Sequence, residues 1–67
     1  MELKDKVVIV TGAAQGLGRQ FALACAENGM KVALADMNPE ALENTRKECE
    51  DKGAEARGYE LNVSQEA

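Results

Sequence analysis

The chain has 67 residues, 45% of them hydrophobic and 30% charged, which is typical of one small folded domain rather than a disordered chain. Nucleic acid is excluded as a partner, because the net charge is −4 and the 8 Lys and Arg residues are scattered along the sequence. The N-terminal stretch carries too few apolar residues for a signal peptide or a spanning helix, so we expect no membrane segment and a cytoplasmic protein.

The first two predicted elements are a strand and a helix. VVIVT at 7–11 is a continuous apolar run that is typical of a strand buried on both faces of a parallel sheet. A helix is predicted over 17–28, and Gly29 is its C-terminal stop. The expected buried stripe of this helix consists of Leu17, Phe21, Ala24 and Cys25.

A second strand is predicted over 31–35, and Asp36 closes it. Asn38 and Pro39 then supply the N-cap and the first position of a second helix, which Gly53 ends. The expected buried stripe of this helix is Leu42, Thr45 and Cys49, and its exposed side carries the i, i+4 pairs Glu43 with Lys47 and Glu48 with Lys52.

A third, more polar strand is predicted over 56–61, as expected for a sheet edge, and Ser64 is the predicted N-cap of a third helix. Strands that alternate with helices predict an α/β fold, a Rossmann-type βαβαβ unit with a parallel sheet. Right-handed crossovers place both helices on one face, which leaves the other face and one edge of the first strand bare. We therefore expect 1–67 to be the N-terminal portion of a doubly wound domain in a longer enzyme, and to be partly unfolded or self-associated when isolated.

The two cysteines give no metal site. Cys25 and Cys49 are far apart in the sequence, and the chain contains no histidine. A zinc site would lack ligands, so we expect no metal and predict that both cysteines are small buried hydrophobic residues.

Three glycines in the stretch TGAAQGLG follow the first strand directly. A tight turn from a strand into a helix leaves the first N–H groups of the helix unpaired, beside the positive end of its dipole, and this arrangement binds anions. We assign Gly12 to the turn, Gly16 to the approach of a phosphate and Gly18 to close packing of the helix. A flexible loop is the structural alternative for this stretch.

Asp36 lies at the end of the second strand, close to the offset expected for a carboxylate that binds a ribose. Its alternative role is a contact with the neighbouring cap residue Asn38. A P-loop is excluded, because Arg19 and Gln20 stand where that motif needs Lys and a hydroxyl residue. A methyltransferase that binds S-adenosylmethionine remains a rival on the pattern alone.

The motif Thr11-Gly12-x-x-x-Gly16-x-Gly18 closely resembles the cofactor signature of the short-chain dehydrogenases/reductases. Lys6 to Val10 before it, Arg19 after it and Leu61-Asn62-Val63 also match, so the resemblance covers nearly the whole chain. Asn62-Val63 is a variant that 3-oxoacyl-carrier-protein reductases also show. The resemblance implies cofactor contacts from Gly12, Gln15, Gly16, Leu17, Gly18, Asp36, Met37, Asn62 and Val63.

The expected cofactor is NAD. A carboxylate at Asp36 can accept hydrogen bonds from the two ribose hydroxyls, whereas it would repel the 2′-phosphate of NADP. In relatives that use NADP, a basic residue stands just before the second glycine or just after the strand end. Here these positions hold Gln15 and Met37.

The resemblance implies hydride transfer between nicotinamide and a small-molecule alcohol or carbonyl, by a homo-oligomer that uses a Ser and a Tyr-x-x-x-Lys pair. The chain has one tyrosine, Tyr59, and Val63 stands four residues after it, so we assign no catalytic residue. The first hypothesis is the N-terminal part of an NAD-dependent oxidoreductase. The second is a non-catalytic module that binds a dinucleotide.

Overall fold

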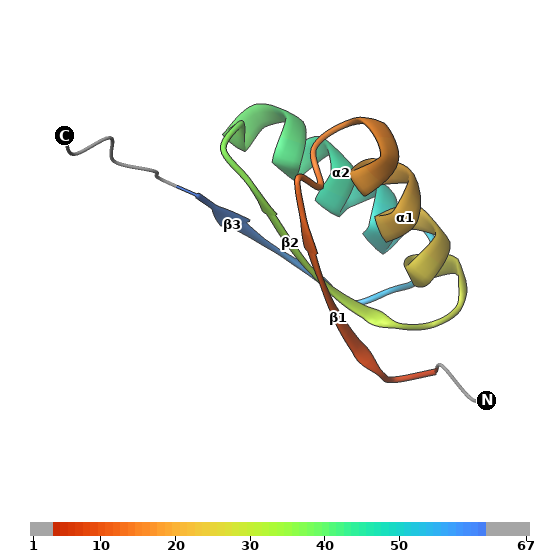
Figure 1. The fold of residues 1–67 in the computed structure, drawn as a ribbon. Coiled ribbons are helices and arrows are strands. Elements are labelled where there is room, and N and C mark those ends of the chain that lie inside the picture. The colour runs from red at the N-terminus through yellow and green to blue at the C-terminus, as the bar shows by residue number, and fades with distance from the viewer. Residues whose placement is uncertain (1–3, 62–67) are drawn as a thin grey trace, which may run out of the picture.

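The computed structural model describes residues 4–61, which form three strands and two helices in the order β, α, β, α, β (Figure 1). Asn62, Val63 and Ser64 lie outside the described residues. In this part of the chain, no helix has the length and apolar character needed to cross a membrane. The elements are β1 (Val7–Thr11), α1 (Gly16–Glu27), β2 (Lys31–Asp36), α2 (Pro39–Asp51) and β3 (Ala56–Glu60).

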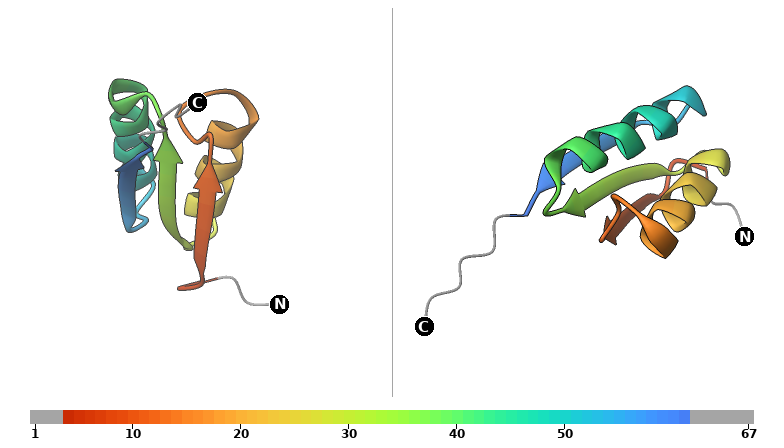
Figure 2. Two further views of the ribbon diagram at one scale, coloured as in Figure 1. Left: turned by 60° about the vertical axis from the view of Figure 1, so that its left-hand side comes forward. Right: turned by 90° about the horizontal axis from the view of Figure 1, so that it is seen from above.

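The sheet is parallel and has the strand order β1-β2-β3. Val8 of β1 lies opposite Val32 of β2, which in turn lies opposite Ala56 of β3. Both helices cover the same face of the sheet, and Figure 2 shows the three strands in front of them in its left view. The predicted βαβαβ unit with a parallel sheet is therefore confirmed, as is the placement of both helices on one face.

The core lies between the sheet and the two helices. Leu34 at the centre of β2 and Cys49 of α2 are fully buried. Thr45 is also fully buried, and its hydroxyl donates a hydrogen bond to the Ala41 carbonyl oxygen. The far face of the sheet is bare, because Val7 and Ile9 are 67% and 73% exposed. The expectation that β1 is buried on both faces is therefore wrong for the described residues: its β-branched side chains alternate between the core and the bare face.

The buried stripe predicted for α1 is wrong at every position except Cys25, which is buried. Leu17, Phe21 and Ala24 are exposed, and the residues that face the sheet are mainly small ones: Ala22, Cys25 and Ala26. Small side chains allow the helix to approach the sheet closely, and the sequence prediction was drawn to the larger apolar residues instead. The stripe predicted for α2 is confirmed, since Leu42, Thr45 and Cys49 are all buried.

The ends of the helices follow the sequence signals closely. Gly29 and Gly53 have φ values of +79° and +89° just after α1 and α2, which is the left-handed conformation that glycine adopts without strain. The Asn38 side chain accepts the N–H of Ala41 over 3.1 Å, as expected for the N-cap of α2. The predicted stops and this cap are confirmed.

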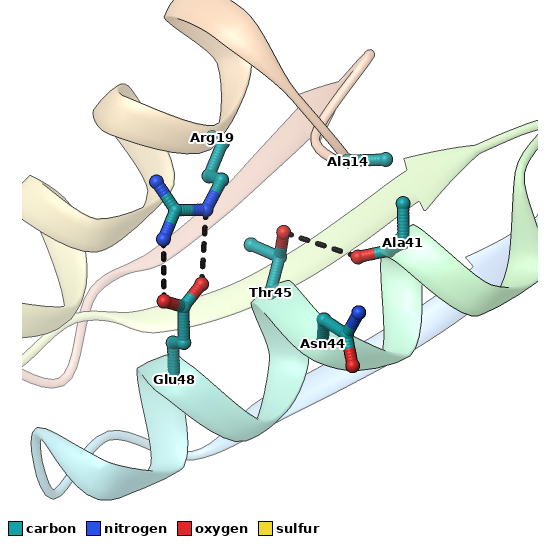
Figure 3. Close-up of a pocket in the computed structure, with 6 residues that line it drawn as sticks. All are labelled: Ala14, Arg19, Ala41, Asn44, Thr45 and Glu48. Atoms are coloured by element: carbon teal, nitrogen blue, oxygen red, sulfur yellow. Dashed lines mark hydrogen bonds and ion pairs between the residues drawn. The ribbon is translucent and has the colours of Figure 1, made fainter.

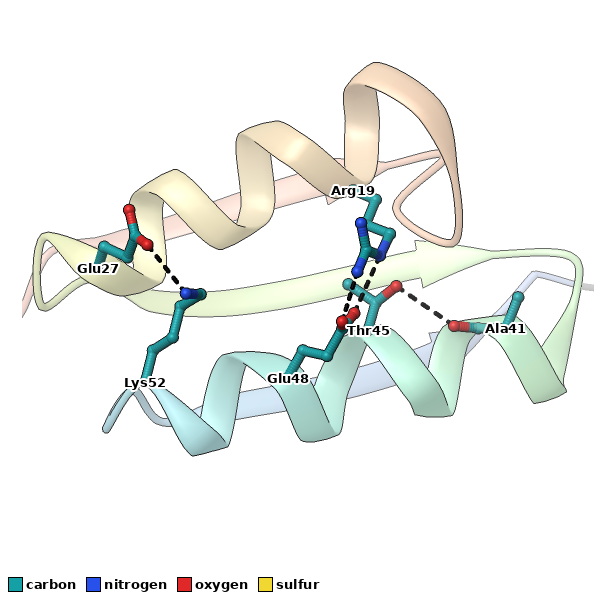
Figure 4. Close-up of polar contacts among 6 residues, drawn as sticks. All are labelled: Arg19, Glu27, Ala41, Thr45, Glu48 and Lys52. Carbon is teal, nitrogen blue, oxygen red and sulfur yellow. Dashed lines mark hydrogen bonds and ion pairs between the residues drawn. The ribbon is translucent and has the colours of Figure 1, made fainter.

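The ion pairs differ from the predicted ones. Glu48 pairs with Arg19 of α1, and Lys52 pairs with Glu27 at the end of α1, so both contacts join the two helices (Figure 4). Glu43 pairs with Arg46, three residues on. The i, i+4 rule considers one helix alone, whereas the packing of α1 beside α2 offers closer partners from the other helix.

Candidate functional site

The predicted site residues that the structure describes gather at the carboxyl edge of the sheet. There the loop between β1 and α1 meets the turn between β2 and α2 (Figure 1). The contact between the two segments is direct, because the Ala14 N–H in the loop donates to the Asp36 carboxylate over 3.0 Å. In open α/β sheets this edge is where ligands bind.

Each of the three glycines in the loop has a conformational reason to be there. Gly12 and Gly16 have φ values of +66° and +62°, a region that strains residues with a side chain. Gly18 is needed for a different reason: a Cβ atom there would overlap the Gly12 carbonyl oxygen. The close packing predicted for Gly18 and the turn predicted at Gly12 are confirmed, so this stretch is a defined turn and not a flexible loop. The approach of a phosphate at Gly16 stays a prediction.

Within residues 4–61, the N-cap side chain leaves the N-terminus of α1 without a capping bond. Gln15 occupies the N-cap position with extended backbone angles, but its side chain makes no capping hydrogen bond, and the first turn contains no acidic residue. The N–H groups of Gly16, Leu17 and Gly18 precede the first intrahelical bonds. Together with the helix dipole, these N–H groups can bind an anion such as a diphosphate.

Asp36 is held by backbone amides. One carboxylate oxygen accepts the Asn38 N–H and the other accepts the Ala14 N–H, both over 3.0 Å. The bond from Asn38, followed by the bond from Ala14, lowers the pKa of Asp36 below its ordinary value. The contact with Asn38 that the sequence offered as an alternative role is therefore present, and the carboxylate keeps further acceptor positions for a ligand.

Exposed apolar side chains flank the carboxylate and the turn. Leu17 is 83% exposed and Met37 is 63% exposed. Gln15 and Met37, the positions that carry a basic residue in relatives using NADP, are uncharged and exposed. This edge of the molecule therefore offers apolar contact area beside backbone N–H donors and the carboxylate of Asp36.

A cavity of about 480 Å³ opens beside the loop, between α1 and α2 (Figure 3). Arg19 spans its wall and donates from Nε to Glu48 Oε1 over 2.9 Å, so the positive charge is neutralised there. Sequence reasoning missed this pair, because its members are 29 residues apart and no local pattern connects them. The lining residues are Ala14, Arg19, Ala41, Asn44, Thr45 and Glu48.

The described residues offer no group of three His, Cys, Asp or Glu side chains that could hold a metal ion. Cys25 and Cys49 are free and buried as predicted, and burial raises the pKa of both thiols. Tyr59 lies on β3 and is 53% exposed.

The parallel βαβαβ unit with a glycine turn and a carboxylate at the end of β2 defines a Rossmann-type nucleotide-binding fold. Residues 6–67 match the family described as short chain dehydrogenase. The chain belongs to the short-chain dehydrogenase family, and the family resemblance found in the sequence is thereby confirmed.

Individual relatives agree with this assignment. A CLA biosynthesis dehydrogenase/reductase from Lactiplantibacillus plantarum is 41% identical over 66 residues, which cover 98% of this chain and 23% of the relative. The crystal structure of an NAD⁺-bound xylitol dehydrogenase superimposes with a TM-score of 0.84 at 46% identity, over 88% of this chain and 23% of that one. A short-chain dehydrogenase/reductase from Burkholderia phymatum in complex with NAD gives 0.86 at 40% identity, over 92% and 22%. The chain thus spans less than a quarter of the length of these relatives.

Proposed function

We propose that this chain binds the adenosine diphosphate part of NAD, as the N-terminal part of a single NAD-binding domain. One observation carries the proposal. The α1 N-terminus, which its N-cap side chain does not cap, lies next to the Asp36 carboxylate, and the loop before α1 donates a hydrogen bond to that carboxylate. The N–H groups of Gly16, Leu17 and Gly18 would face the diphosphate. Gly12 allows the turn that brings them there.

The adenosine would lie between the loop and the β2–α2 turn. The free acceptor positions of Asp36 suit the two ribose hydroxyls, and the exposed side chains of Leu17 and Met37 supply apolar contact. Gln15 completes the loop side of this site. Asn62 and Val63 would border the adenine, as the family resemblance implies.

NAD is preferred to NADP in this proposal. The negative charge of Asp36 would lie next to the 2′-phosphate of NADP, and neither Gln15 nor Met37 offers a compensating cation. The lowered pKa of Asp36 keeps the carboxylate charged throughout the neutral range. Two of the solved relatives are described with NAD, which supports the same choice.

For the whole protein we propose an NAD(H)-dependent oxidoreductase that interconverts a small-molecule alcohol and a carbonyl. When bound, the cofactor supplies hydride transfer at its nicotinamide end, and this chain holds the other end. A non-catalytic dinucleotide-binding module is the alternative. A Ser followed by Tyr-x-x-x-Lys after residue 67 of the gene product would favour the enzyme, and its absence would favour the module.

Several finer parts of the proposal stay predictions. Asn62-Val63 carries the suggested nearness to 3-oxoacyl-carrier-protein reductases, and the comparisons give no specific support for that subfamily. A homo-oligomeric state and a cytoplasmic location likewise remain predictions.

The test is a parallel titration of NADH, NADPH and S-adenosylmethionine into the full-length protein by calorimetry. We expect NADH to bind most tightly and Asp36→Ala to lower the preference for NADH over NADPH by about tenfold, because the like-charge repulsion is removed. Glu60→Ala is the matched control, since it removes a carboxylate from the neighbouring strand end, and it should leave the preference unchanged. Tighter binding of S-adenosylmethionine than of NADH would overturn the proposal.

A further inference from the structure

Asp36 joins three segments of the chain at the carboxyl edge of the sheet. Its backbone carbonyl oxygen accepts the Leu61 N–H over 2.8 Å, just after β3. Its carboxylate accepts one N–H from the β1–α1 loop and one from the β2–α2 turn. Asp36 therefore links three segments of the protein through hydrogen bonds. A carboxylate needed only to bind a ligand would not require these bonds.

The loop amides that follow Gly12 are committed to β2. The Ala13 N–H donates to the Ala35 carbonyl oxygen over 3.2 Å, and the Ala14 N–H donates to the Asp36 carboxylate. Ala13 and Ala14 are only 0% and 7% exposed. An N–H in such a place needs an acceptor from the protein, and at Ala14 the side chain of Asp36 supplies it.

These two bonds decide which amides remain for an anion. With Ala13 and Ala14 turned toward β2, the next N–H groups along the chain are those of the N-cap residue Gln15 and of the first turn of α1. Gly12 and Gly16 supply the positive φ values on either side of this pair, so the loop changes direction at both ends of the segment that Asp36 holds. The Asp36 carboxylate therefore holds the loop at a point between these two changes of direction.

We propose that Asp36 is a positioning residue for the glycine turn, in addition to its contact with the ribose. By holding the Ala14 amide, it sets the direction in which the α1 amides face the diphosphate. The two roles are compatible, because a carboxylate has about four acceptor positions and the amides of Ala14 and Asn38 occupy one on each oxygen. The identity of the ligand rests on the proposed function, whereas the hold on the turn does not.

Two nucleotides separate the roles. ADP carries both ribose hydroxyls and 2′,3′-dideoxy-ADP carries neither, so only an effect through the turn can weaken binding of the second. We expect Asp36→Ala to weaken dideoxy-ADP by about tenfold or more, the effect of losing one charge-assisted hydrogen bond, and to weaken ADP further. Glu60→Ala should leave both affinities within about twofold, since Glu60 lies beside Asp36 in the sheet but no hydrogen bond among the described residues joins its side chain to the loop. If Asp36→Ala weakens ADP alone, the positioning role is wrong and the contact with ribose stands.

A measurement without any nucleotide covers the case in which Asp36→Ala does not fold. Amide hydrogen exchange of the unaltered full-length protein should show Ala14 as well protected as Ala13. The milder Asp36→Asn keeps one oxygen, and we expect it to speed exchange at Ala14 by about tenfold while Ala13 stays slow. An Ala14 amide that exchanges freely beside a protected Ala13 overturns the proposal, even if NAD binds. Protection at Ala14 without any NAD binding would instead remove the proposed function and keep the positioning role.

Discussion

The two turns from strand to helix in this molecule differ in how they satisfy the unpaired N–H groups at the start of the helix. After β2, the chain satisfies the start of α2 from its own sequence: Asn38 caps Ala41, Pro39 occupies the first position and Glu40 adds a negative charge in the first turn. After β1, the start of α1 has a glycine turn, no side-chain cap and no acid. The difference teaches that the start of α2 is satisfied by its own side chains, whereas the start of α1 leaves N–H groups that can bind an external anion.

The same comparison explains the composition of the two turns. A helix that is capped by its own side chain tolerates ordinary residues around it. A helix N-terminus that must receive a ligand needs its backbone accessible, and three of the chain's 6 glycines fall in the stretch before and at the start of α1. Four predictions test this contrast, from the largest expected effect to the smallest.

Gly18→Ala should have the largest effect. The new Cβ would overlap the Gly12 carbonyl oxygen, so α1 must shift away from the loop. We expect a loss of stability of about 1 to 3 kcal/mol from this overpacking and a loss of NAD affinity of about 100-fold from misplaced amides. Thermal unfolding and calorimetry measure the two effects.

Gly53→Ala is the control for this substitution. It introduces the same methyl group at a φ of +89° after α2, where nothing lies within 4 Å of the new atom. We expect a cost of about 1 kcal/mol from the strained backbone and unchanged NAD affinity. Equal losses of affinity in the two variants would mean that binding follows overall stability and not the geometry of the α1 turn.

Gln15→Asp would turn the first helix start into a copy of the second. Gln15 already has the extended backbone of an N-cap residue, so an aspartate there can accept an N–H from the first turn of α1. We expect a gain in stability of about 0.5 to 1 kcal/mol, together with a roughly tenfold loss of NAD affinity from competition and charge repulsion. Chemical denaturation and calorimetry should therefore move in opposite directions.

Gln15→Ala is the control that separates the effect of the new negative charge on NAD affinity from the effect of losing the glutamine side chain. This variant leaves the helix start uncapped and adds no charge, so its loss of NAD affinity measures the contact of the glutamine alone and should be smaller than the loss in Gln15→Asp. Full affinity in Gln15→Asp would show that the diphosphate does not use these amides.

Asn38→Ala should affect stability alone. It removes the bond from Ala41 to the cap of α2, at a cost of about 1 kcal/mol, and keeps the backbone N–H that Asp36 accepts. NAD affinity should stay within about twofold, because the proposed cofactor site does not use the N–H groups at the start of α2. Asn44→Ala, in the interior of α2, is the matched control and should be neutral or slightly stabilising in urea unfolding.

Elements that depend on local signals could be predicted from the sequence. The start of α2 is specified by Asn38 and Pro39 within two residues, and the stops by Gly29 and Gly53, so these boundaries agree with the structure. The glycine turn could be predicted for the same reason. Its spacing fixes a backbone path that few other residues allow.

Features that depend on distance between elements could not be predicted. The buried side of α1 is set by how closely the helix approaches the sheet, so Ala22 and Ala26 are buried while Phe21 is 54% exposed. The partner of Glu48 comes from the other helix, and the partner of Ala14 is a side chain 22 residues away. The sequence pattern placed Asp36 at the site but contained no sign of its bond to the loop.

The smallest expected effect is the pH dependence of the stability that Asp36 contributes by accepting hydrogen bonds from both turns. The amides of Asn38 and Ala14 favour the charged form of Asp36 and lower its pKa in the folded state. A lowered pKa means that the unfolded chain binds the proton more readily, so this stabilisation is fully present above the unfolded value of about 3.9 and is lost as the pH falls through the folded value. The effect is small, because the carboxylate is partly exposed and water competes for it.

Urea unfolding of the unaltered protein and of Asp36→Asn measures this contribution. Near neutral pH the variant should be less stable, and the difference should shrink as the pH falls below the unfolded value of about 3.9 and then through the lower pKa of the folded protein. Glu60→Gln corrects for the general effect of removing one negative charge at this edge of the sheet. If the difference between Asp36→Asn and the unaltered protein stayed constant at low pH, the charge of Asp36 would contribute nothing to holding the two turns together, and the bond to Ala14 would act only as a neutral hydrogen bond.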